Sequence, residues 1–194
     1  LPVIRKSELT ELQKAARPFG GLAAVKWGAA CARVFASPGP IYEPEGARRD
    51  YWRLARAFYA AGFRPGDLVH NTFSYHFTPA GSMTETAAHA LGCTVFPAGV
   101  GQTEMQVAAM LDLRPDAYAG TPSFLRILLD KAAEAGLRLD SLKKAFVSGE
   151  AFPPSQRQAL AAAGIHAYQA YATADIGLIA FETPALEGMV LDED

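Results

Sequence analysis

The feature that most limits the fold of this chain is a regular alternation of helix-like and strand-like segments. Apolar residues at helical spacing predict helices over 83–91, 103–113, 121–136 and 153–163. Short apolar runs between and after them predict strands over 93–96, 117–119, 145–147 and 166–171. This order favours a mostly parallel sheet with helices on both faces. We therefore expect an α/β fold.

The first third of the chain gives weaker signals. Ser7 is a candidate N-cap for a helix over 7–16, and a loop-rich stretch follows it. A second helix is expected over 50–61, ending at Gly62. A turn at Pro65 and Gly66 then leads into a short strand near residues 68–69.

Composition excludes several classes of protein. Half of the 194 residues are hydrophobic, enough for a core in one large or two small domains. The formal charge of -2, without a basic stripe, does not suit a nucleic-acid partner. Cys31 and Cys93 lack the spacing of a metal site and suit a reducing compartment. No apolar run approaches the roughly 20 residues of a membrane span, and no signal peptide opens the chain, so we expect a cytoplasmic protein without membrane partners.

The two ends of the sequence indicate a fragment. The chain begins at Leu1 without a Met, and it stops shortly after a strand-like run over 188–191. Such a run normally needs a following turn or cap, so we expect further chain in the natural protein.

Two segments place small residues and one carboxylate where an apolar run stops. They are 147–152 (VSGEAF) and 169–177 (QAYATADIG). In α/β proteins, loops at such positions open toward a ligand. The alternative for the first segment is an ordinary strand-to-helix turn, with Glu150 placed near a helix N-terminus, where a carboxylate is favoured.

These two segments resemble the nucleotide-binding loops of adenylate-forming enzymes, most closely the phenylacetate-CoA ligase branch of the acyl- and aryl-CoA ligases. Five further segments resemble that branch in the same order: AAGFRPGD (60–67), LGCTVFP (91–97), GQTEMQ (101–106), GTPSFL (120–125) and GIHA (164–167). The resemblance implies part of the large N-terminal domain of such an enzyme. Residues 1–46 would be an opening segment with a degenerate phosphate loop, residues 47–194 would be the α/β core with the nucleotide and acyl sites, and the C-terminal domain would be absent.

The resemblance also implies a nucleotide site. It assigns contacts to Ser148, Gly149, Glu150, Ala151, Gln169, Ala170, Tyr171, Ala172, Thr173 and Asp175. In the family, the aromatic residue stacks on adenine, a hydroxyl reaches a phosphate and a Glu holds Mg²⁺. Here Ala174 replaces the hydroxyl residue, Thr173 lies one position early, and Asp175 is one methylene shorter than Glu. Asp175 is the expected Mg²⁺ ligand.

The phosphate loop departs most from the family. The family reads close to ASSGTTGKP, whereas residues 36–44 read ASPGPIYEP, so Ser37 and Gly39 keep the register and Glu43 stands in place of Lys. Two prolines also remove backbone donors. At about 4 Å and an effective dielectric near 20, replacing attraction by repulsion toward one phosphate charge costs on the order of several kcal/mol. We therefore do not expect this loop to bind the triphosphate of ATP as the family's loop does.

The segment 74–79 (SYHFTP) lies where relatives line the acyl pocket. Tyr75 and Phe77 are candidate aromatic walls, His76 is a candidate partner for a carboxylate or thioester oxygen, and Gly120 is assigned to the same pocket. The alternative is a solvated loop with a core Phe and a hydrogen-bonded His. No Ser-His-Asp or Cys-His spacing stands out, and no catalytic residue is identified.

The function implied by the resemblance is ATP-dependent activation of an aryl or hydrophobic carboxylic acid to an acyl-adenylate, followed by transfer to CoA. ATP or AMP, Mg²⁺ and CoA would be its cofactors, and the fragment alone would be inactive. One alternative is a catalytically impaired module that binds a nucleotide, acyl-CoA or a partner. Another is an unrelated doubly wound domain. The acid is not identified, and a homodimer is left open.

Overall fold

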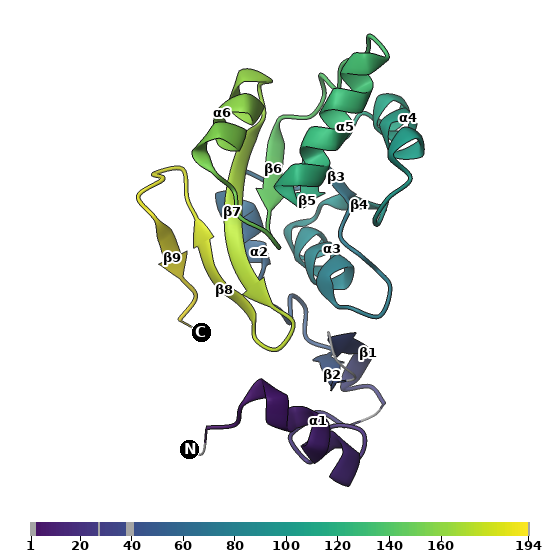
Figure 1. Ribbon diagram of the computed structural model, residues 1–194, viewed down its shortest axis with the longest axis vertical. Helices are drawn as coiled ribbons and strands as arrows, with labels where there is room; N and C mark the ends of the chain where they lie inside the picture. The colour runs from purple at the N-terminus through teal and green to yellow at the C-terminus, as the bar shows by residue number, and fades with distance from the viewer. Residues whose placement is uncertain (1–2, 27, 38–40, 194) are drawn as a thin grey trace.

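The computed structural model describes residues 3–26, 28–37 and 41–193 (Figure 1). Its centre is a seven-stranded sheet in the order β4-β3-β5-β6-β7-β8-β9. The strands are β3 (Leu68–Asn71), β4 (Thr94–Pro97), β5 (Ala117–Gly120), β6 (Lys144–Val147), β7 (His166–Thr173), β8 (Gly177–Glu182) and β9 (Met189–Leu191). Strands β3 to β7 pair in parallel, and β8 and β9 continue the sheet in antiparallel pairing. The expected mostly parallel sheet is confirmed.

Helices cover both faces of this sheet. They are α2 (Ala55–Ala60), α3 (Ala80–Leu91), α4 (Thr103–Leu113), α5 (Pro122–Glu134) and α6 (Pro154–Ala162). Successive strand residues point to opposite faces. Accordingly, Ala119 and Phe146 share one core cluster with α2 and α3, while Tyr118 and Val147 share the other with α4, α5 and α6.

Local capping explains why several expected boundaries are confirmed. The Thr121 hydroxyl accepts a hydrogen bond from the Phe124 amide at 3.3 Å, and Pro122 is the first residue of α5. Gly92 ends α3 with a φ of 83°, which glycine adopts without a Cβ clash.

Two expected helices are placed differently. Helix α2 begins only at Ala55, because Asp50 and Arg53 adopt left-handed φ angles of 51° and 64°. The two Asp50 carboxylate oxygens instead lie 3.2 and 3.1 Å from the Ala55 amide nitrogen and accept its hydrogen bond. Asp50 therefore caps the first residue of α2 from a position before the helix. Helix α1 spans Lys6–Ala15 with Arg5 as its N-cap, so Ser7 lies inside the helix.

A small hairpin lies in the stretch that was expected to be rich in loops. Strands β1 (Cys31–Ser37) and β2 (Ile41–Gly46) form a separate antiparallel pair. Helix α1 docks against β2 through the buried side chain of Gln13, which donates to the Tyr42 carbonyl and accepts from the Tyr42 amide, both at 2.8 Å. Within the described residues, no helix is long and apolar enough to cross a membrane.

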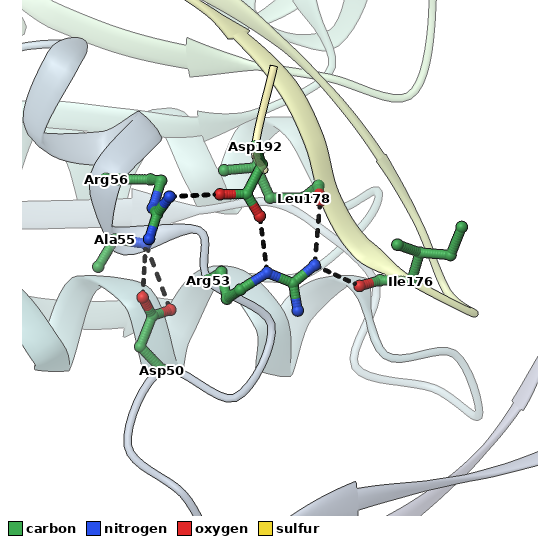
Figure 2. Close-up of polar contacts among 7 residues, drawn as sticks. All are labelled: Asp50, Arg53, Ala55, Arg56, Ile176, Leu178 and Asp192. Carbon is green, nitrogen blue, oxygen red and sulfur yellow. Dashed lines mark hydrogen bonds and ion pairs between the residues drawn. The ribbon is translucent and has the colours of Figure 1, made fainter. Parts of the chain in front are cut away.

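Ion pairs between a buried carboxylate and two partly exposed arginines connect the turn before α2 to the antiparallel strands (Figure 2). The side chain of Asp192 is fully buried, with Arg53 and Arg56 each 2.6 Å from one of its oxygens. Arg53 also donates to the carbonyls of Ile176 and Leu178 at 2.9 and 3.2 Å. This contact fixes the unusual turn at Arg53 and the strand pair β8–β9 together.

Removing the carboxylate charge should destabilise the fold. We expect Asp192→Asn to lower the free energy of unfolding by about 2 to 3 kcal/mol, because two guanidinium groups lose their partner. Urea unfolding measures the change. Asp140→Asn is the matched control, since Asp140 pairs with Arg138 at the exposed surface and should change stability by less than about 0.5 kcal/mol. Equal stability of the two variants would contradict this role for Asp192.

Candidate functional site

Parallel pairing brings the two predicted ligand loops together. The Ser148 amide donates to the Gly120 carbonyl at 3.2 Å, and the Ser148 hydroxyl, which is buried, donates to the Ala170 carbonyl at 2.8 Å. Beyond them, the Gln169 side-chain amide donates to the Glu150 carbonyl at 2.9 Å. The loop after β6 is therefore bonded to the end of β5 and to strand β7, and these segments form one surface at the carboxyl edge of the sheet.

Glu150 holds this surface to a helix. Its carboxylate accepts from the Ser123 amide at 2.6 Å, at the second residue of α5. A negative charge is stabilised there by the unpaired amides of the first helical turn. The carboxylate is thus near a helix N-terminus, as the alternative interpretation expected, although the helix is α5. The exposed neighbours Gly149 and Ala151 leave their backbone accessible to a flat ligand.

The end of β7 presents an aromatic side chain to solvent. Tyr171 is 57 % exposed, and the β7–β8 ladder is irregular between Tyr171 and Ala172. A bulge of this kind re-aims the side chains beside it. The Thr173 hydroxyl accepts from the Ile176 amide at 3.2 Å and so stabilises the turn into β8. Tyr171 is available to stack on a base, whereas the Thr173 oxygen is already engaged.

The residues expected around phosphate form a compact charged cluster. The Ser37 hydroxyl donates to Glu43 at 2.8 Å, and the Lys6 ammonium lies 2.8 Å from the Asp175 carboxylate. Glu43 and Asp175 also line one cavity of about 390 Å³, together with Tyr51. The hairpin, the end of β7 and helix α1 therefore meet at this point. Gly39, the other expected phosphate-loop residue, lies outside the described residues.

Two carboxyl groups face each other in this cluster. Burial, with the hydrogen bond and charge of Asp175 as further causes, raises the pKa of Glu43 to about 6. Partial burial opposes ionisation of Asp175, but hydrogen bonds from Lys6 and Glu43 hold its pKa below the usual value. The second Glu43 oxygen is buried and has no hydrogen-bond partner among the described residues, which disfavours its ionised form.

The predicted acyl-pocket residues differ in how firmly they are held. The Tyr75 hydroxyl accepts from the Asn71 side chain and donates to Glu85, both at 2.8 Å, and burial raises the pKa of Tyr75. His76 is exposed, and Phe77 is 82 % exposed at a φ of 60°. These two hydrogen bonds hold the Tyr75 side chain in place. The alternative that Phe77 is a core residue is wrong, because its side chain points to solvent.

Gly120 is required by close packing. A Cβ atom there would collide with the Thr72 hydroxyl and with Tyr118. Tyr118 is fully buried, accepts from Thr72 at 2.8 Å and donates to the Thr121 carbonyl at 3.0 Å. The absence of a side chain at Gly120 thus makes room for a hydroxyl pair below the carboxyl edge.

Two members of the site carry no signal in the sequence. Lys6 lies 169 positions before Asp175, and Ser123 contributes only a backbone amide. No group of three or more His, Cys, Asp or Glu side chains suited to a metal occurs among the described residues. Asp175 and Glu43 provide a carboxylate pair, which fits the one or two carboxylates that Mg²⁺ takes alongside phosphate oxygens.

Comparison with known proteins identifies the class of this arrangement. No protein-family model matches the chain. A crystal structure of 2-hydroxyisobutyryl-CoA ligase in an open conformation, in complex with 2-HIB-AMP and CoA, superimposes with a TM-score of 0.86 and 27 % identity, over 98 % of this chain and 44 % of that one. The chain has the fold of the adenylate-forming CoA ligases.

Sequence comparison shows which CoA ligases the chain is related to. The phenylacetate-coenzyme A ligase of Aromatoleum evansii is 34 % identical over 176 residues, covering 84 % of this chain and 40 % of the relative. That of Thermus thermophilus is 32 % identical over 149 residues, covering 73 % and 32 %. The chain is a homologue of the phenylacetate-CoA ligases and spans 40 % or less of the length of these two relatives. The expected resemblance is confirmed.

The titration of Glu43 should appear in the stability of the protein. Its pKa is raised from 4.5 to about 6, so the folded state holds a proton that the unfolded state releases. This stabilisation is complete below pH 4.5 and is lost as pH rises through about 6. After discounting for a partly exposed group, we expect a loss of about 1 kcal/mol.

The comparison of wild type with Glu43→Gln isolates this contribution. Urea unfolding between about pH 4 and 7 should show the wild-type protein losing stability relative to the variant, with Glu11→Gln on the exposed surface of α1 as the control. A difference that does not change with pH would show that Glu43 titrates normally.

Proposed function

We propose that this chain forms the nucleotide- and acyl-binding part of an AMP-forming acid–CoA ligase that acts on an aryl or otherwise hydrophobic carboxylic acid. The relatives are named phenylacetate-CoA ligases, and the similar solved structure holds an acyl-AMP and CoA. The observation that carries the proposal is the direct joining of the loop after β6 to strand β7 through Ser148 and Gln169. These two segments carry the residues that the resemblance assigns to the nucleotide.

The reaction would have two steps. An acid carboxylate oxygen would attack the α-phosphorus of ATP and expel pyrophosphate, and the CoA thiol would then attack the acyl carbonyl and release AMP. The protein would contribute chiefly positioning and charge neutralisation. We assign adenine stacking to Tyr171, base-edge contact to the backbone at Gly149 and Ala151, and the acyl wall to Tyr75 and Gly120. His76 and Phe77 would border the acyl entrance.

Asp175, with Glu43 beside it, is the side chain that we propose to hold Mg²⁺. Bound Mg²⁺ would neutralise phosphate charge. The fit rests on the carboxylate pair facing a cavity. We further propose that the chain belongs to the large N-terminal domain of the enzyme, as the order of its motifs indicates.

A second function is favoured by one observation. Glu43 is a partly buried carboxyl group that faces another carboxylate in the region expected to meet phosphates. A module that binds AMP or acyl-CoA without adenylation would tolerate this charge better than a working ligase, since it need not hold a triphosphate.

Pyrophosphate release separates the two functions. If the protein is a ligase, the natural full-length form with ATP, Mg²⁺ and a panel of aryl and hydrophobic acids should release pyrophosphate only when acid is present, at roughly 1 to 1000 per second for a good substrate. A coupled pyrophosphate assay measures this. Binding of AMP by calorimetry without any acid-dependent pyrophosphate release would support the binding module and reject the ligase.

The role of Asp175 can be tested independently of turnover. Asp175→Asn should remove most of the Mg²⁺-dependent gain in ATP affinity, about tenfold for one charged oxygen ligand. The difference between calorimetric titrations with and without Mg²⁺ measures this gain. Asp130→Asn, which breaks an exposed pair with Arg126 on α5, is the control. Unchanged Mg²⁺ dependence in a folded Asp175→Asn variant would exclude Asp175 as a ligand.

A further inference from the structure

The charged cluster at the proposed nucleotide site lacks a lysine from the hairpin, although Arg48 and Arg53 line the adjoining cavity. Where the resemblance expects the phosphate-loop lysine, the chain has Glu43, and Asp175 lies beside it. Two neighbouring carboxyl groups repel a phosphate unless a cation accompanies them. Lys6 contacts this pair: its ammonium lies 2.8 Å from Asp175 and acts electrostatically on Glu43 as well.

Helix α1 is fixed in the position that brings Lys6 to the site. Lys6 and Gln13 are seven residues apart, close to two helical turns, so they lie on the same face of α1. Gln13 pairs with both backbone groups of Tyr42, the residue next to Glu43 in β2. The same face of α1 therefore hydrogen-bonds to the hairpin near the end of the helix and pairs with Asp175 at its start.

The Lys6 ammonium keeps capacity for a ligand. Its side chain is 47 % exposed, and that of Asp175 is 34 % exposed. A lysine has three N–H donors and Asp175 takes one, so two remain to be directed at other acceptors. A carboxylate that orients a lysine without covering it is a suitable support for a phosphate-binding cation.

We propose that Lys6 takes over the charge role of the missing phosphate-loop lysine and contacts the phosphate oxygens of the bound nucleotide, while Asp175 orients its ammonium. This inference rests on the proposed nucleotide site. It assigns a binding role to a residue of the first helix, outside the loops that the motifs define. The competing role is a latch: Lys6 would only pair with the Asp175 carboxylate and so block the binding of a metal ion there.

Three ligands distinguish these roles: ATP, AMP and adenosine, each titrated by calorimetry into the natural full-length protein. We expect Lys6→Gln to weaken ATP and AMP on the order of tenfold, the effect of one charge-assisted contact at a partly exposed site, and to leave adenosine unchanged. Lys14→Gln is the matched control, because Lys14 pairs with Glu11 on the exposed side of the same helix. It should change none of the three affinities.

A rescue variant adds an independent test. Restoring a lysine in the hairpin by Glu43→Lys in the Lys6→Gln background should recover most of the lost ATP affinity, since a positive charge returns to the same cluster. Lys6→Arg, which keeps the charge, should bind ATP more tightly than Lys6→Gln.

The outcomes are distinct. Unchanged ATP affinity in Lys6→Gln would overturn the inference, and tighter Mg²⁺-ATP binding would show the latch instead. An equal loss for adenosine would show a structural role only. If the wild-type protein bound none of the three ligands, both the proposed function and this inference would be rejected. If the wild-type protein binds them but Lys6→Gln does not behave as expected, only the inference about Lys6 is rejected.

Discussion

The parallel pairing of β5, β6 and β7 is the constraint on which the rest of the structure depends. Parallel strands place all their carboxyl ends at one edge, so loops that are about twenty residues apart in sequence become neighbours. Small, fully buried residues such as Ala119 and Ala145 let the helices approach the sheet from both sides. The hydrogen bonds of Ser148 and Gln169 then only need to span adjacent strands.

Much of this fold could be predicted from local sequence because its boundaries are set locally. A threonine cap, a proline at the first helical position and a left-handed glycine act within a few residues. The misplaced parts depend on distant partners. The left-handed turn at Arg53 is stabilised by Asp192, 139 positions away. Strand β2 contains Pro44 and Gly46, which disfavour a strand, and it forms because β1 and Gln13 satisfy its backbone.

The same distinction applies to the candidate site. The order of the motifs predicted where the loops lie, because small residues at the ends of strands determine the shape of the backbone there. It did not reveal which atoms are already engaged. The Glu150 carboxylate binds the first turn of α5, and the Thr173 hydroxyl binds the turn into β8, so neither is fully free for a ligand. The contact between Lys6 and Asp175 has no periodicity or motif that sequence reading can detect.

The departures from the family pattern occur at residues that touch one another. By the resemblance, Glu43 stands where the family has a lysine and Asp175 where it has a longer glutamate, and the structure places both in one cluster with Lys6. A carboxyl pair in a partly buried site shares a proton or binds a cation, so the charges of Glu43 and Asp175 depend on each other and on the nearby ammonium of Lys6. We therefore interpret the altered hairpin and the shortened acidic residue as parts of a single rearranged charge system. In that interpretation, the effect of losing the phosphate-loop lysine depends on Lys6 of helix α1.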